Sequence, residues 1–159
     1  MASVGEAGTR NEESAISQVS EEIKQRAADM EKEIIAERRY FHKHPELSLK
    51  ETETANALCW RLASMGIEYT RVPGNGIIAT IKGTAPDAYD AEGNPRRRIA
   101  LRSDIDALPV TELTGAPYAS ENEGVMHACG HDCHMSMLLG AARILLGMTD
   151  EIHAVSYTH

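Results

Sequence analysis

The chain has 159 residues, about the length of one average domain or of a piece of a larger one. Its 24 acidic and 16 basic residues give a formal net charge of −8, which makes nucleic acids and anionic membranes poor partners. No apolar run approaches the ~20 residues of a membrane span, and residues 1–18 contain neither a basic leader nor an apolar signal core. We therefore expect a cytoplasmic protein, with its three cysteines reduced.

Residues 1–19 are treated as a polar, disordered tail, because the first 13 of them are small, polar and acidic. Apolar residues then recur every three or four positions and predict a helix that runs to about Phe41. Pro45 ends this helix, and a second helix follows, with Ser48 and Glu51 as its capping box and Gly66 as its terminator. The apolar positions of the first helix are Ile16, Val19, Ile23, Ala27, Met30 and Ile34.

The pattern changes after Gly66 to short β-rich runs. Residues 67–72 and 77–83 flank a Gly-Asn-Gly turn and predict an antiparallel hairpin, and residues 99–104 predict a core strand. A buried helix follows over residues 134–148, where apolar residues return to helical spacing. This order of elements predicts an α/β fold.

Two carboxylates, Asp104 and Asp106, follow the last of these strands. Ligands of open α/β sheets gather beyond the carboxyl ends of strands, where such a pair could orient a metal-bound imidazole or hold a cation. A solvated turn with an Asx cap explains the same two residues about equally well.

The stretch "HACGHDCH" places three histidines and two cysteines within residues 127–134, immediately before the last helix. Cys129 and His131 are separated by Gly130, which suits two side chains that converge on one zinc ion or another late divalent metal. The alternative reading is that the two cysteines are small buried hydrophobic residues and the histidines are polar caps. The sequence does not fit a zinc deaminase, because it lacks the His-x-Glu and Pro-Cys-x-x-Cys motifs of that class. It does not fit a cysteine hydrolase well either, because no base can be placed beside the thiol.

The segments "RRYFHKHPELSLKETETA", "RSDIDALPVTE" and "MHACGHDCHMSMLLGAARILL" together resemble the M20 family of metallopeptidases. The resemblance is to its branch of aminoacylases, hippurate hydrolases and auxin-conjugate hydrolases, and it runs from about residue 20 to residue 153. It implies the N-terminal part of a zinc-peptidase-like catalytic domain, with helices packed on a mixed sheet. It also implies a hydrolase of linear amides that cleaves N-acyl amino acids with two divalent ions per full-length subunit, whether Zn, Mn, Co or Ni.

The resemblance assigns Cys129 and His131 as metal ligands and Asp104, Asp106 and Asp132 as supporting residues. The family's catalytic glutamate follows the cluster helix and is absent from this chain, so no catalytic residue is assigned and the chain alone is expected to be inactive. If it were active, Asp132 would be the first candidate for the base. The small-molecule substrate is the expected partner, and the resemblance leaves room for a homo-oligomer of the full-length protein.

The metallohydrolase part is placed at residues 20–153. Residues 154–159 do not resemble the family and are interpreted as a tail left by truncation. The alternative hypothesis is a short protein that binds a metal or a partner without catalysis.

Overall fold

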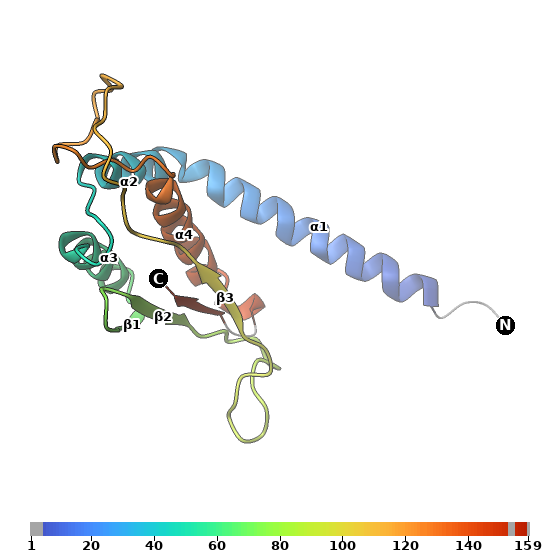
Figure 1. Cartoon of the computed structure of the whole chain (residues 1–159). Coiled ribbons are helices and arrows are strands. Elements are labelled where there is room, and N and C mark those ends of the chain that lie inside the picture. The colour runs from blue at the N-terminus through green and yellow to red at the C-terminus, as the bar shows by residue number, and fades with distance from the viewer. Residues whose placement is uncertain (1–4, 153–154, 159) are drawn as a thin grey trace.

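The computed structural model describes residues 5–152 and 155–158, with side chains described from residue 16 to residue 152. Helices pack over a four-stranded mixed sheet, and α1 extends away from the rest of the molecule (Figure 1). The predicted α/β fold with helices on a mixed sheet is confirmed. The elements are α1 (Gly5–Asp29), α2 (Glu31–Lys43), α3 (Thr52–Ser64), β1 (Glu68–Arg71), β2 (Ile77–Ile81), β3 (Ile99–Arg102), α4 (His131–Leu146), η1 (Thr149–Glu151) and β4 (Val155–Thr158).

The sheet has the strand order β1-β2-β4-β3. β2 pairs with β1 and with β4 in antiparallel fashion, whereas β3 and β4 are parallel. Val155 is the partner of both Ile81 and Ile99, so β4 lies between β2 and β3. The prediction that residues 99–104 form a core strand was wrong. β3 lies at the edge of the sheet, and Ile99 is 57% exposed.

The β1–β2 hairpin matches the sequence prediction closely. Gly74 and Asn75 both have positive φ, 80° and 63°, which is the backbone that a tight turn between twisted strands requires. The Val72 N–H donates to the Gly76 carbonyl at 2.9 Å and closes the loop. Glycine and asparagine tolerate this conformation better than other residues, which explains why this sequence turns here.

The N-terminal helical region differs from the prediction in two ways. The helix begins at Gly5, so residues 5–19, expected to be a tail, form its first turns, while residues 1–4 lie outside the described residues. Glutamate and alanine in this stretch are good helix formers. The prediction of a disordered tail considered only the polarity of these residues and not their helix propensity. The helix also breaks at Met30, where the chain bends so that α2 can pack along α4. Neither a proline nor a glycine explains this bend.

The predicted capping box of the second helix was also wrong. Ser48 lies outside α3, whose N-cap residue is Glu51, and Glu51 makes no capping bond with its side chain. The Glu46 carboxylate instead accepts hydrogen bonds from the backbone N–H groups of Glu53, at 3.2 Å, and Thr54, at 2.7 Å. A longer side chain from further back in the sequence therefore satisfies the first donors of the helix.

The hydrophobic core fills the space between the helices and one face of the sheet. Alternate residues of β2 point into it, as the two-residue period of a strand requires. Among the described residues, no helix is long and apolar enough to cross a membrane. The core consists chiefly of Phe41, Ala55, Leu58, Leu62, Ile77, Ala79, Ile81, Met135, Leu138, Leu139 and Ala142.

The substitution Leu58→Ala tests this core. Leu58 is fully buried, so its truncation should lower the free energy of unfolding by about 2–5 kcal/mol in chemical denaturation. Leu113→Ala makes the same chemical change at a side chain that is 91% exposed, and should alter stability by less than about 0.5 kcal/mol. Equal effects of the two substitutions would contradict the described core.

Candidate metal centre

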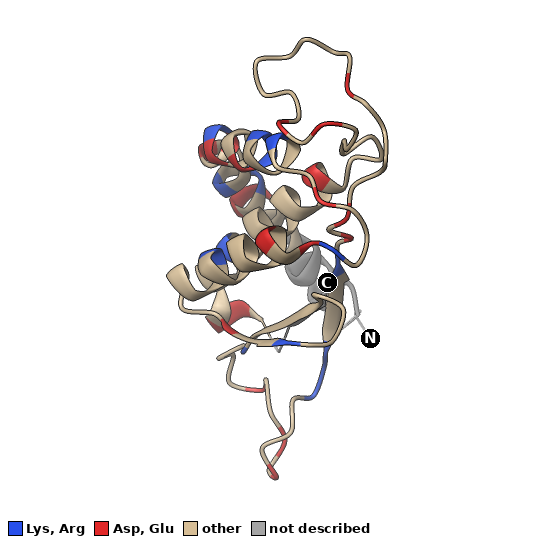
Figure 2. Ribbon diagram, turned by 60° about the vertical axis from the view of Figure 1, so that its left-hand side comes forward, with Lys and Arg blue, Asp and Glu red and all other residues tan. Residues whose placement is uncertain are grey.

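A loop from residue 103 to residue 130 connects β3 to α4 and carries most of the candidate site. It contains five acidic residues and neither lysine nor arginine, and Figure 2 shows its acidic positions. Leu108 and Met126 exchange backbone hydrogen bonds of 3.0 Å across the loop, and the Ala107 N–H donates to the Glu46 carbonyl at 2.7 Å. These bonds hold a long segment without regular structure against the connection between α2 and α3.

The predicted ligand residues lie on either side of a left-handed turn. Gly130 is the N-cap of α4 and has a φ of +82°, a conformation that side chains other than glycine's rarely adopt. Cys129 immediately precedes it and is exposed, whereas His131 is the first residue of the helix and is partly buried. The local sequence thus places a thiol and an imidazole at the start of α4, as predicted.

His131 is held by Asp106. The imidazole Nδ1 lies 2.9 Å from the Asp106 carbonyl oxygen and 3.0 Å from its carboxylate Oδ1. Both neighbours are acceptors, so Nδ1 carries the proton and donates it, and the lone pair remains on Nε2. This carboxylate–imidazole pair is the usual arrangement of a histidine that binds a metal through its other nitrogen.

Asp104 lies apart from this pair. Its carboxylate accepts a hydrogen bond of 2.9 Å from Arg102 at an exposed position. Together with Asp106 and the buried Glu51 it lines a hollow of about 210 Å³ beside the hairpin turn. The structure therefore places the two loop aspartates around one hollow, and only Asp106 contacts the imidazole of His131.

Asp132 is completely buried and faces away from solvent. Its Oδ2 lies 2.7 Å from His42 Nδ1 and 2.7 Å from Arg38 Nε, and the contact with Arg38 is an ion pair too poorly aligned for a hydrogen bond. A carboxylate engaged in this way cannot act as an exposed base, so the suggestion that Asp132 would abstract a proton is corrected. Burial alone would lower the pKa of Arg38, but Asp132, Tyr118 and Cys133 hold that pKa above its usual value.

The other nitrogen of His42 contacts a second buried carboxylate. Nε2 lies 3.2 Å from Glu112 Oε1, and the two side chains are 4% and 3% exposed. Glu112 also accepts hydrogen bonds from the Ser120 N–H, at 2.6 Å, and from the Thr114 hydroxyl. Burial alone would raise the pKa of Glu112, but the hydrogen bonds from Thr114, Ser120 and His42 hold it below its usual value.

Sequence reasoning did not assign a role to Arg38, His42 or Glu112. Arg38 and His42 belong to the quoted segment "RRYFHKHPE", where an arginine and a histidine stand four residues apart on one helical face. That spacing could have identified Arg38 and His42 as neighbours on one face of the helix. Glu112 is distant in the sequence and gave no such signal.

His127 is a buried histidine that no functional assignment had included. It is 4% exposed, and neither of its ring nitrogens has a hydrogen-bond partner among the described residues. Burial is the main cause that lowers its pKa to about 4, and the nearby carboxylates of Asp132 and Asp106 oppose the shift. His127 is therefore neutral at pH 7 and lies among the same charged groups as the candidate site.

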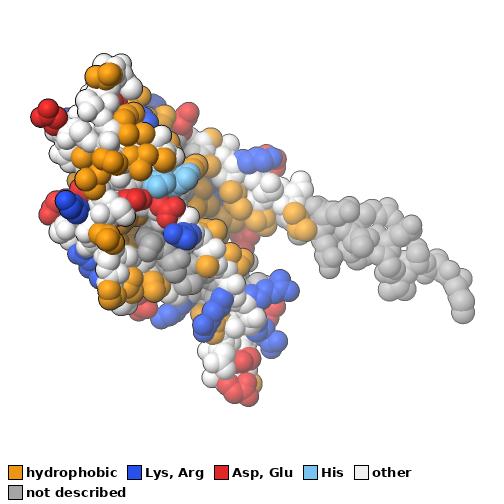
Figure 3. All heavy atoms as spheres, viewed as in Figure 1, with side chains coloured by type: hydrophobic (Ala, Val, Ile, Leu, Met, Phe, Trp, Pro, Cys, Tyr) orange, Lys and Arg blue, Asp and Glu red, His pale blue; other side chains and the backbone are white. Residues whose placement is uncertain are grey.

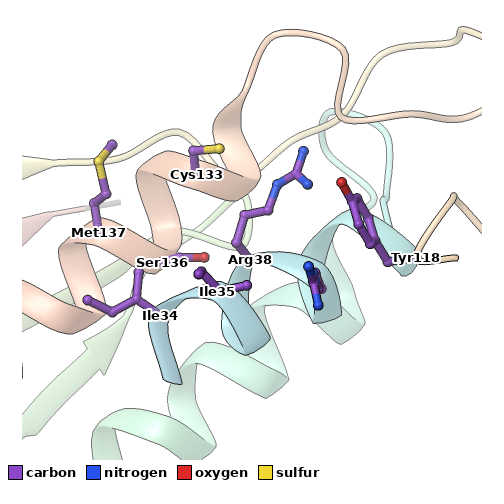
Figure 4. A pocket seen from close by; sticks show the side chains of 8 residues that line it. Ile34, Ile35, Arg38, Tyr118, Cys133, Ser136 and Met137 are labelled. Carbon is purple, nitrogen blue, oxygen red and sulfur yellow. The ribbon is translucent and has the colours of Figure 1, made fainter. Parts of the chain in front are cut away.

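The remaining residues of the cluster lie on other faces of α4. Cys133 is about 200° around the helix from His131 and lines a groove of about 340 Å³ between α2 and α4. Figure 4 shows Arg38 extending between Cys133 and Tyr118 at one end of this groove. His134 is exposed, and its ring centroid lies 5.7 Å from that of His131. On the face seen in Figure 3, histidine side chains lie between acidic and hydrophobic ones.

Within residues 5–152 and 155–158, no three histidine, cysteine, aspartate or glutamate side chains come together as a metal site. Cys129 and His131 thus form a pair of donors rather than a full ligand set. A thiol and an imidazole with a free Nε2 are nevertheless the donor types that zinc and related metals prefer.

The fold matches part of the fold of a metal-binding peptidase. A dinuclear metal binding peptidase of the M20 family from Bacillus subtilis has a TM-score of 0.73 and 38% identity, over 82% of this chain and 35% of that chain. The model of peptidase family M20/M25/M40 matches residues 100–157, and the chain belongs to this family. The match extends to residue 157, so the interpretation of residues 154–159 as a tail unlike the family was wrong for most of that segment, and residues 155–158 form strand β4.

Two curated relatives are similarly close. The chain is 41% identical to an N-acyl-L-amino acid amidohydrolase of Geobacillus stearothermophilus, over 83% of this chain and 34% of that protein. It is 44% identical to an N-acetyl-L-cysteine deacetylase of Bacillus subtilis, over 77% of this chain and 28% of that protein. The chain spans about a third of the length of the curated relatives it matches.

The depressed pKa of His127 predicts a pH dependence of stability. The unfolded chain takes up a proton on this residue near pH 6.5 and the folded chain only near pH 4, so stability is lost as the pH falls between these values. The loss from this residue at pH 5 relative to pH 7 should be about 2 kcal/mol in metal-free denaturation experiments. His127→Gln should abolish that part, whereas His44→Gln, at an exposed histidine, should retain it. Identical pH profiles for all three proteins would contradict this assignment.

Proposed function

We propose that this chain is part of a metal-dependent amidohydrolase that cleaves the amide bond of N-acyl amino acids. The contact between Asp106 and His131 carries this proposal, because it fixes the imidazole with Nε2 free to bind a metal. The names of the relatives support the substrate class, since one acts on N-acyl amino acids and the other on N-acetyl-cysteine. Family membership supports a hydrolase that uses divalent metal ions.

In this proposal Cys129 and His131 hold the metal. The thiol of Cys129 is exposed and would bind a metal as the thiolate, and Asp106 accepts the hydrogen bond from Nδ1 of His131 and so leaves Nε2 facing away from it as the donor atom. Divalent ions bound there supply Lewis acidity, which lowers the pKa of water and polarises the amide carbonyl. Asp104 contributes negative charge to the hollow beside Asp106, and Asp132 supports the site from within the protein.

The proton transfer to the leaving amine needs a positioned base. Asp132 is buried in ion pairs, and Asp106 is already occupied by His131. The resemblance to the M20 family implies that the general base is a glutamate that follows the cluster helix, and we propose the same for this protein. Two ions in each full-length subunit then complete the centre.

Metal titration tests the ligand assignment. The chain should bind Zn²⁺ weakly, because it contributes two protein donors, and Cys129→Ser should weaken the binding further. Asp106→Ala should lower the affinity by roughly 10–100-fold through misorientation of His131. Asp150→Ala, an exposed aspartate in η1, is the matched control and should leave the affinity unchanged. Tight binding that Cys129→Ser does not alter would refute the assignment.

An activity assay tests the placement of the base. The chain alone should not hydrolyse N-acetyl or N-benzoyl amino acids in the presence of Zn²⁺, Mn²⁺ or Co²⁺, because a general base contributes typically ~10²–10⁴-fold to the rate. Release of the free amino acid is the measurement, and a full-length M20 amidohydrolase is the positive control. Turnover by the purified chain that Cys129→Ala abolishes would show that a base lies within it.

A further inference from the structure

The charged side chains beneath the candidate centre form one continuous buried chain. Asp132 contacts Arg38 and His42, and His42 in turn contacts Glu112. Nδ1 of His42 faces Asp132 and Nε2 faces Glu112, so the imidazole lies between the two carboxylates. Three of the four side chains are at most 4% exposed, and the fourth, Arg38, is 29% exposed. Side chains from α2, from the 103–130 loop and from the first turn of α4 thus meet in one network.

This network closes a ring with the candidate metal ligands. Asp132 is covalently adjacent to His131, and His131 is held by Asp106 on the loop. Glu112 lies six residues after Asp106 on the same loop and contacts His42, which in turn contacts Asp132. The imidazole of His131 is therefore fixed from two sides, directly by Asp106 and through the helix backbone by Asp132.

The first turn of α4 has no side-chain cap. Its N-cap is Gly130, which has no side chain to cap the helix and adopts a left-handed backbone. The direction of Cys129 and His131 thus depends on how the residues after the glycine are held. Asp132 is the most tightly held residue of this turn, because it is fully buried and its partners Arg38 and His42 both lie at 2.7 Å.

We propose that His42 and Glu112, through Asp132, are positioning residues that set the direction of the Cys129 and His131 side chains toward a bound metal. This inference rests on the proposed function, since it assumes that these two residues bind the metal. His42 and Glu112 do not touch the metal. They act by holding the first turn of α4 against the loop that carries Asp106, which preorganises the two donors.

Cobalt provides a readout that a purely structural role would not change. Co²⁺ bound by a thiolate has a sulfur-to-cobalt charge-transfer band, whose position and intensity report the geometry at Cys129. The experiment titrates the 159-residue chain with Co²⁺ and records this band, the apparent Kd and the melting temperature. The variants are His42→Gln and Glu112→Gln, both of which keep a polar side chain of similar length.

Glu37→Gln is the matched control. Glu37 forms a half-buried ion pair with Arg61, which joins α2 to α3 rather than to the 103–130 loop. We expect His42→Gln and Glu112→Gln each to weaken Co²⁺ binding by about 10-fold and to shift the band. The double variant should lose less than the product of the two effects, because both substitutions break the same chain. Glu37→Gln should lower the melting temperature and leave the Kd and the band as in the wild type.

The outcomes separate this inference from the proposed function. If the wild-type chain shows no cobalt band that depends on Cys129, the metal centre itself is wrong, and the positioning role falls with it. If the wild-type band is present but unchanged in His42→Gln and Glu112→Gln, the positioning role alone is overturned. A variant that fails to fold is replaced by Asp132→Asn, for which an unchanged Kd and band would also overturn the proposal.

Discussion

The buried carboxylate of Asp132 is the constraint on which much of this structure depends. An ionised group without solvent is unfavourable unless cationic and hydrogen-bonding partners reach it, and here Arg38 and His42 come from one face of α2. That requirement fixes how α2 lies against α4, the pair of helices that pack most extensively in the molecule. The bend at Met30 serves the same end, because it directs α2 along α4 while α1 runs outward.

The same constraint explains how a 28-residue loop is anchored to the helices. The segment 103–130 has no helix or strand of its own, yet Glu112 is buried against His42 and the backbone is bonded to the α2–α3 connection. The carboxylates of this loop would be more favourable in solvent if Arg38 and His42 did not lie beneath it. Order in the loop in turn keeps Asp106 in place beside His131. The buried contact of Glu112 with His42 and the contact of Asp106 with His131 are thus made by the same loop.

Local features of the sequence predicted the local structure well. The hairpin followed from alternation around Gly74 and Asn75. The last helix, predicted over residues 134–148 from its apolar period, spans residues 131–146 in the structure. The assignment of Cys129 and His131 as metal donors stays a prediction. Pairings between distant segments were not accessible in this way. The position of β4 between β2 and β3, the Glu46 cap of α3 and the contact of His42 with Glu112 each join residues that no short-range pattern connects. The exposed Ile99 misled for the same reason, since its apolar run is typical of a central strand.

The central place of β4 affects how the protein can fold as it is synthesised. β2 and β3 are linked in the sheet through β4, whose residues pair with positions 56 to 80 residues earlier in the chain. While a ribosome is still translating the helix that precedes β4, the hairpin and β3 are already exposed with an unfilled gap between them. Unpaired strand edges attract other edges, so the nascent chain passes through a stage at which it is open to chaperones and to misassociation. Because α4 precedes β4 in the chain, α2 and α4 can associate, and bring Arg38, His42 and Asp132 together, before β4 is available to complete the sheet.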